Sequence, residues 1–277
     1  MSHEPAVSPQ KFVHKPSCGS LFSGIGAMDL GIERAGFELK WQVEIDPYCR
    51  RVLERHWPGL PRGEDVRTWP HADTERVDLL FGGFPCTDIS HAGRREGIDG
   101  QKSGLWSEFR RIIRELRPGV VLVENVAALL GRGASRVFGD LAADGFDCEW
   151  ACVPAAAVGA PHLRDRVFIC AHSASGRQSE LRRTQREDGQ PDGIRASVAN
   201  ANGAGLAFGQ VFSGNAREEL TAFERGCSTG AGQWAAEPDV GRMADGVANR
   251  VDRLRGLGNG VVPQVAEWIG KRLMLVL

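Results

Sequence analysis

The chain has 277 residues, of which 42% are apolar and 25% are charged, and its formal net charge is −1. These values are ordinary for a globular protein with a sizeable core, and they exclude a chain that is basic overall. Any contact with DNA must therefore come from local positive charge. The length suits one large domain, or a core with a small appendage.

The cysteine content indicates reduced thiols. Seven cysteines are present, an odd number, and none forms a Cys-x-x-Cys pair, so we expect neither a disulfide framework nor a zinc ribbon. Cys148 and Cys152 have a metal-like spacing, but no nearby cysteine or histidine in the sequence completes a ligand set, and no metal is expected. The first residues lack the apolar core of a signal peptide, and no apolar run approaches the ~18 residues of a membrane helix. We expect a cytoplasmic protein with no membrane contact.

Apolar runs alternate with amphipathic stretches from Cys18 to about His172. This alternation is typical of βαβ units, in which a parallel sheet is covered by helices on both faces. The sequence thus predicts an α/β fold. The predicted strands are 17–22, 39–45, 77–83, 120–126 and 166–172, and the predicted helices are 27–36, 47–57, 107–119 and 136–145.

The pattern changes after His172. Residues 173–245 are rich in Gly, Ala, Ser, Asn and Arg, without a clear period of 2 or 3.6, and acids outnumber the eight arginines. Regular structure returns near Arg250, with a helix predicted in 261–277. We therefore expect a catalytic and cofactor-binding domain at 1–172, a small loop-rich region at 173–245, and a C-terminal segment at 246–277.

A glycine-rich turn follows the first predicted strand. Gly24 and Gly26 allow a sharp turn and close approach of a ligand, and Glu44 ends the next strand, where an acid suits a ribose diol. Asp29 occupies the place of the third glycine of a dinucleotide loop. The turn therefore favours a ligand without a pyrophosphate, such as S-adenosylmethionine, over a nicotinamide dinucleotide.

Two reactive residues lie at or just beyond the carboxyl ends of neighbouring predicted strands. Cys86 lies just beyond 77–83, after Pro85, and Glu124 lies at the carboxyl end of 120–126. Strand order predicts that both emerge at one edge of the sheet, where α/β proteins bind ligands. A thiolate can add to carbon 6 of cytosine and activate carbon 5, and a desolvated glutamic acid can protonate ring nitrogen 3. The alternative interpretations are a buried structural thiol for Cys86, and a helix N-cap or a surface salt bridge for Glu124.

These motifs, in this order, resemble the C5-cytosine DNA methyltransferases. The similar segments are FSGIGA at 22–27, FPCTDIS at 84–90, ENV at 124–126, HLRDR at 162–166 and GNGVVPQVAEWI at 258–269. The resemblance implies a Rossmann-like S-adenosylmethionine-dependent methyltransferase fold, with 173–245 as the target-recognition region. It implies that Cys86 and Glu124 are catalytic and that Arg164 and Arg166 position a flipped cytosine.

The resemblance also implies contacts with the cofactor and with DNA. Phe22 would line the adenine pocket, and Glu44 and Asp65 would hold the ribose and adenine. The remaining expected cofactor contacts are Ser23, Gly24, Ile25, Gly26, Ile45, Val66, Pro85, Leu105, Asn259, Gly260 and Val261. The expected DNA contacts are Ser90, His162 and the basic residues Arg94, Arg95 and Lys102 of the Gly-rich loop 91–104, which would close over the flipped base.

The sequence thus predicts methylation of cytosine in double-stranded DNA by a monomer, with a restriction endonuclease as a possible partner. A tRNA cytosine methyltransferase shares the chemistry and remains an alternative. An inactive DNA-binding relative and a nicotinamide-dependent oxidoreductase are the alternatives from other classes.

Overall fold

The computed structural model describes residues 15–85, 104–173, 250–275 and 277. Cys86, Ser90, Arg94, Arg95 and Lys102 lie outside these ranges, as does the expected target-recognition region apart from Ser173. In the part of the chain that is described, none of the helices has both the length and the apolar character needed to cross a bilayer.

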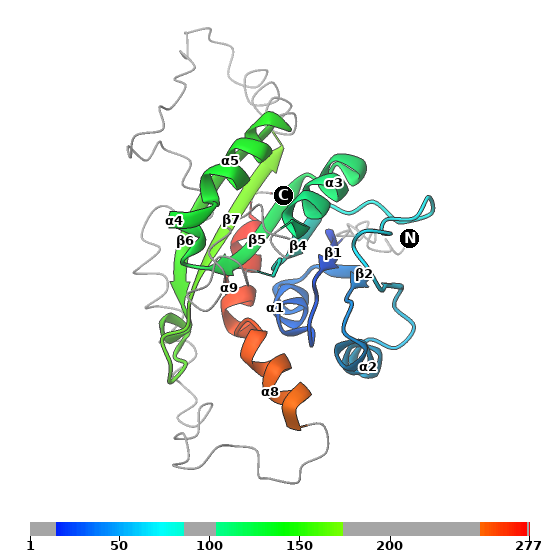
Figure 1. Ribbon diagram of the computed structural model, residues 1–277, viewed down its shortest axis with the longest axis vertical. Helices are drawn as coiled ribbons and strands as arrows, with labels where there is room; N and C mark the ends of the chain where they lie inside the picture. The colour runs from blue at the N-terminus through cyan, green and yellow to red at the C-terminus, as the bar shows by residue number, and fades with distance from the viewer. Residues whose placement is uncertain (1–14, 86–103, 174–249, 276) are drawn as a thin grey trace, which may run out of the picture.

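The described residues form a seven-stranded sheet in the order β3-β2-β1-β4-β5-β7-β6, with helices on both faces (Figure 1). The strands are β1 (Ser17–Leu21), β2 (Glu38–Val43), β3 (Arg62–Gly63), β4 (Leu79–Gly82), β5 (Val120–Val126), β6 (Phe146–Pro154) and β7 (Asp165–Ser173). The helices are α1 (Ala27–Ala35), α2 (Pro47–His56), α3 (Leu105–Leu116), α4 (Leu129–Arg132), α5 (Ala134–Ala143), α8 (Arg250–Asn259) and α9 (Pro263–Leu273), with a 3₁₀ turn at Ala155–Val158.

Two hydrophobic cores lie on opposite faces of this sheet. Leu80 and Val121 face the core formed with α3 and α5, whereas Leu79 and Leu122 face the core formed with α1 and α9. Adjacent residues of one strand point to opposite faces, and both faces are covered. This double burial explains the continuous apolar runs of the central strands and confirms the predicted α/β class.

The first five strands in the sheet order are parallel, and β7 runs antiparallel to both β5 and β6. The sequence predicted β7 as a late strand of a mostly parallel sheet without assigning its direction, and it did not predict β6. The edge strand β6 could not be recognised from the sequence, because FDCEWACVP mixes charged and apolar residues. Most of these residues are only partly buried. The reversed direction of β7 matters for the site, because it brings the beginning of this strand to the end of β5.

Helix α9 packs closely against α1. A Cβ atom built on Gly31 of α1 would come within 2.3 Å of the Pro263 carbonyl oxygen, and one on Gly270 within 2.6 Å of the Ala35 Cβ. Glycine at both positions lets the two backbones approach each other. The C-terminal segment therefore covers the same sheet face as the first helix (Figure 1).

Candidate active site

A cavity of about 490 Å³ opens at the carboxyl ends of β1, β2, β4 and β5. This is the edge at which open α/β sheets bind ligands, and the volume lies in the range of small-molecule sites. Most of the expected cofactor residues line it. They are Phe22, Ser23, Gly24, Ile25, Glu44, Ile45, Asp65, Val66, Pro85, Leu105, Asn259, Gly260 and Val261.

The glycine turn after β1 shapes one wall of the cavity. Gly24 has a φ of 56°, in the left-handed region that favours glycine, and a Cβ there would meet no atom within 4 Å. Its amide donates to Glu44 Oε2 at 2.7 Å, and the Asp46 amide donates to Glu44 Oε1 at 2.8 Å. Burial raises the pKa of the Glu44 carboxyl, and these two hydrogen bonds oppose that effect. Glu44 is thus fixed at the end of β2, facing the cavity.

Gly26 has a different role from Gly24. It precedes α1 with a φ of 81°, and a Cβ there would approach the Trp57 ring to 2.4 Å. Among the residues that the structure describes, the cavity lining does not include Gly26. Its small size permits the packing of α2 beneath the loop.

Acidic side chains predominate around the cavity. The lining contains Asp29, Glu44, Asp46, Glu64, Asp65, Glu124 and Asp252, against Arg67, Arg166 and Arg255. Among these acids, Asp65 is paired with Arg67, and hydrogen bonds from Arg67 lower the pKa of its carboxyl. Such a lining favours a cationic ligand over one that carries a pyrophosphate.

Glu124 and Arg166 form an ion pair at the end of β5. Arg166 Nε lies 3.0 Å from Glu124 Oε1, and both side chains are largely buried. The antiparallel register places Arg166, the second residue of β7, opposite Val126, so this arginine reaches the carboxyl end of β5. Burial raises the pKa of Glu124 to about 7, although Arg166 and Arg164 act to lower it. The Glu124 carboxyl can therefore hold or release a proton near neutral pH.

The chain leading to Cys86 is held against the end of β5. Strands β4 and β5 are parallel neighbours. Asn125 Nδ2 donates to the Phe84 carbonyl at 3.1 Å, and the Glu124 carboxyl lies against Gly83. Pro85 lines the cavity, and Cys86 is the next residue in the chain, just outside the described range.

Arg164 contacts the last turn of α8 and the residue that follows this helix. Its Nη2 donates to the carbonyls of Gly258 and Gly260, each at 2.6 Å, and its φ of 40° is unusual for a residue other than glycine. Arg164 is absent from the described lining, whereas Asn259, Gly260 and Val261 belong to it. Arg164 therefore contacts the wall of the cavity that Asn259, Gly260 and Val261 form, without lining the cavity itself. His162 lies exposed on the loop before β7.

Sequence reasoning missed several lining residues. Asp252, Arg255 and Gly256 come from α8, a helix that was not predicted and whose apolar residues Val251, Leu254 and Leu257 are exposed. The anchoring role of Asn125 was also missed, although the ENV motif contained it.

Comparisons with known proteins point to one family. The model of the family described as C-5 cytosine-specific DNA methylase matches residues 17–204. The type II methyltransferase M2.BsuMI of Bacillus subtilis is 29% identical over 290 residues, which covers 92% of this chain and 74% of that protein. M.Bsp6I of Bacillus sp. is 34% identical over 157 residues, or 54% of this chain and 50% of that protein.

Among solved structures, a protein described as a DNA modification methyltransferase encoded within an E. coli prophage has a TM-score of 0.50 and 26% identity. The match covers 59% of this chain and 48% of that one. The chain spans about half the length of several curated relatives that it matches. Because the family model covers more than half of its length, the chain belongs to the C-5 cytosine-specific DNA methylase family.

Proposed function

We propose that this protein transfers a methyl group from S-adenosylmethionine to carbon 5 of cytosine in a specific duplex DNA sequence, through a covalent bond between Cys86 and the base. One observation carries the proposal. The Glu124–Arg166 pair and the backbone that leads into Cys86 face the same cavity as the glycine turn and Glu44.

The residues of the cavity fit S-adenosylmethionine. Gly24 leaves open space where a side chain would intrude, and Glu44 offers a carboxylate to a ribose diol. Phe22, Ile45 and Val66 supply apolar surface for the adenine, and the excess of acids suits a sulfonium and an ammonium group. When bound, the cofactor supplies an electrophilic methyl group. The same acids disfavour a nicotinamide dinucleotide, whose pyrophosphate is anionic.

The residues of the chain account for activation of the base. The target cytosine must leave the helical stack, because carbon 6 cannot be attacked inside a duplex. The Cys86 thiolate adds to carbon 6, and protonated Glu124 gives its proton to ring nitrogen 3, so that carbon 5 becomes nucleophilic. Arg166 is positioned to donate to ring oxygen 2. After methylation, a base removes the proton from carbon 5, the carbon–sulfur bond breaks, ring nitrogen 3 returns its proton to Glu124, and the thiolate is regenerated.

Other parts of the proposal concern recognition and setting. Residues 173–245 would read the DNA sequence, because they lie between β7 and α8, both of which supply residues to the site. The basic residues of 91–104, with Ser90 and His162, would contact DNA. The names of the relatives favour a type II restriction–modification role, with a cognate endonuclease as a partner. We expect a cytoplasmic monomer.

Trapping with 5-fluorocytosine tests the mechanism. Duplex DNA that carries this base should form a stable covalent complex in the presence of S-adenosylmethionine, because fluorine cannot leave carbon 5 as a proton does. Cys86→Ser should abolish both the complex and turnover while the calorimetric affinity for the cofactor is retained. Full methylation by Cys86→Ser would contradict the covalent mechanism.

Competition between substrates and cofactors tests the alternatives. Duplex DNA should be methylated in preference to tRNA, and the reverse preference would favour the tRNA enzyme. Tight binding of a nicotinamide dinucleotide without binding of S-adenosylmethionine would overturn the cofactor assignment. Bisulfite sequencing of DNA from cells that express the protein would reveal the recognition sequence.

A further inference from the structure

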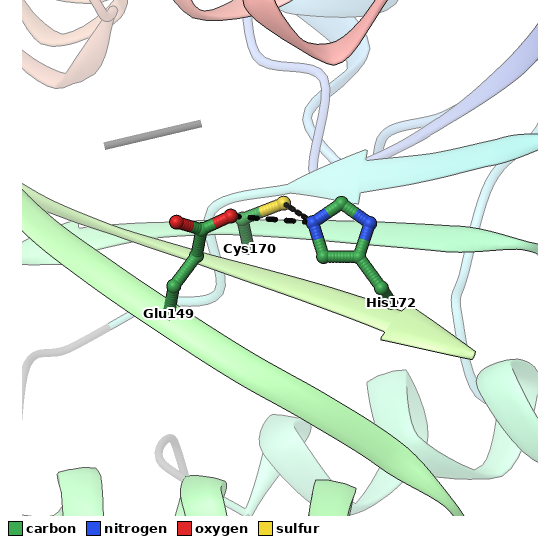
Figure 2. Close-up of side chains that lie close together, drawn as sticks. All are labelled: Glu149, Cys170 and His172. Atoms are coloured by element: carbon green, nitrogen blue, oxygen red, sulfur yellow. Dashed lines mark hydrogen bonds and ion pairs between the residues drawn. The ribbon is translucent and has the colours of Figure 1, made fainter. Parts of the chain in front are cut away.

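Three side chains with metal-ligating atoms meet on the β6–β7 pair, away from the active site. Glu149 comes from β6, and Cys170 and His172 come from β7 (Figure 2). His172 Nε2 lies 3.2 Å from Cys170 Sγ and 3.4 Å from Glu149 Oε1. Within the described residues, this is the group of three such side chains whose ligand atoms all lie within 4.8 Å of one another.

The strand register holds these side chains in place. Glu149 pairs directly with Cys170 across the antiparallel ladder, and Cys170 and His172 are two positions apart on one strand. Residues two apart share a face of the sheet, and directly opposed residues also share one. All three therefore project to the face covered by α9, from backbone positions fixed by ladder hydrogen bonds. A site built in this way needs little reorganisation to bind an ion.

The geometry differs from that of a nucleophile–histidine–acid relay. A relay uses the two ring nitrogens for separate tasks, one toward the thiol and one toward the acid. Here sulfur and carboxylate oxygen both approach the same nitrogen, Nε2 (Figure 2). One ring nitrogen carries either one proton or one lone pair, so it cannot serve both neighbours fully. Three ligand atoms that lie within 4.8 Å of one another can instead be shared by a cation placed among them.

We propose that Glu149, Cys170 and His172 form a binding site for a divalent transition metal of the zinc class. Thiolate, imidazole and carboxylate are the ligands that such an ion prefers, and tetrahedral coordination places neighbouring ligand atoms about 3–4 Å apart. The charges of thiolate and carboxylate would together balance a dication. When the ion binds, the Cys170 thiol releases its proton to solvent, and water can fill the fourth position.

The surroundings of the cluster allow an ion to enter. Cys170 is fully buried, but the side chains of His172 and Glu149 are 21% and 10% exposed. The neighbouring cation is Arg272 of α9, which lies over the Trp268 ring. Burial lowers the pKa of Arg272, and the charge of Glu149 raises it. Glu149 has two carboxylate oxygens, and Oε1 is the one near His172, so one carboxylate can serve both the metal and the guanidinium.

The site lies well away from the reaction centre. His172 is six residues along β7 from Arg166, a separation of about 20 Å in an extended strand. An ion there would fasten the edge strand β6 to β7, whose opposite end carries the active-site arginine. Its expected effect is on the stability of the sheet edge and not on the chemistry.

Cobalt binding by the full chain tests the proposal. Metal-free protein titrated with Co²⁺ should develop a thiolate-to-cobalt charge-transfer band that saturates at one ion per chain, and Zn²⁺ should remove the band. Zn²⁺ should also raise the melting temperature. The variants His172→Gln and Glu149→Gln should weaken or lose the band, and Cys170→Ser should lose it.

Matched cysteine variants serve as controls. Cys152→Ser removes an exposed thiol from the same strand pair, and Cys86→Ser removes the proposed nucleophile, so both should keep the band. If Cys170→Ser fails to fold, the cobalt band of His172→Gln and Glu149→Gln still tests the site. The absence of the band in the unaltered protein, or its persistence in both His172→Gln and Glu149→Gln, would overturn the proposal. Neither result depends on methylation activity.

Discussion

The carboxyl group of Glu124 lies directly against the backbone of Gly83. A Cβ atom built on Gly83 would come within 2.4 Å of Glu124 Oε2. Gly83 begins the short segment that runs from β4 to Cys86, so this contact joins the proposed acid to the chain that carries the proposed nucleophile. Glycine is needed here because of this close approach. Its backbone conformation does not require glycine, since its φ lies outside the left-handed region.

We expect Gly83→Ala to impair catalysis more than folding. The atom that the new methyl group meets first is the end of a flexible side chain, so the carboxyl can turn away at small cost to stability. The rate of methylation should fall by about 100-fold or more, as for loss of a general acid, while cofactor affinity is retained. Gly139→Ala is the matched control, because Gly139 is exposed on α5 with nothing near its Cβ position. Equal rates for both variants would refute this role of Gly83.

The activity should decline on the basic side of neutrality because of Glu124. Its pKa is raised by burial from 4.5 to about 7, so the fraction that can donate a proton falls as pH rises through that value. In the pH profile, kcat/KM should therefore have a basic limb near pH 7. Glu124→Gln should lower the rate by about 100-fold or more and remove this limb. If the basic limb of the kcat/KM profile is unchanged in Glu124→Gln, a group other than Glu124 causes it.

The raised pKa of Glu124 also predicts that the free energy of unfolding depends on pH. Because the folded-state pKa lies above the ordinary value, the stabilisation from protonated Glu124 is fully present below pH 4.5 and is lost as pH rises through about 7. Denaturant unfolding across this interval should show a smaller decrease in stability for Glu124→Gln than for the unaltered protein.

Arg164 and Arg166 should respond differently to substitution by lysine. Arg164 donates to the carbonyls of Gly258 and Gly260 through one nitrogen, Nη2, and the compact ammonium of a lysine would not hold its donors at the position of this end of the planar guanidinium. We expect Arg164→Lys to weaken cofactor binding several-fold, because Gly260 lines the cavity. Arg166→Lys should instead lower kcat with little change in cofactor affinity, because Arg166 contacts Glu124. Calorimetry and steady-state kinetics on the pair would separate these effects, and identical profiles would contradict the assignment.

The close packing of α1 on α9 should make Gly31→Ala destabilising. The added methyl group would meet the Pro263 carbonyl oxygen at 2.3 Å, and backbone atoms cannot move as freely as a side-chain end. Overpacking of this kind costs about 1–3 kcal/mol, which urea unfolding would measure. Gly139→Ala again serves as the control, since it places the same substitution in a helix with free space. A Gly31→Ala protein as stable as this control would show that the two helices can separate without cost.

The sequence alone determined the central part of the molecule. The run that became β4 and the first four residues of β5 are continuously apolar, because both faces of a parallel sheet are buried, and the boundaries of β5 matched the prediction. Their order along the chain was enough to place Glu124 beside the segment that leads to Cys86, since neighbouring parallel strands end at the same edge. Local composition also indicated the glycine turn and Glu44.

The tertiary structure decided everything that depends on pairing between distant residues. Only the antiparallel direction of β7 brings Arg166 to Glu124, because a parallel strand would have left this arginine at the opposite edge of the sheet. Only the pairing of β6 with β7 places Glu149 beside Cys170 and His172, residues whose spacing in the sequence gives no sign of a ligand set. Strand direction and register are set by contacts between chain segments, and neither is encoded in the local apolar period from which strands are predicted.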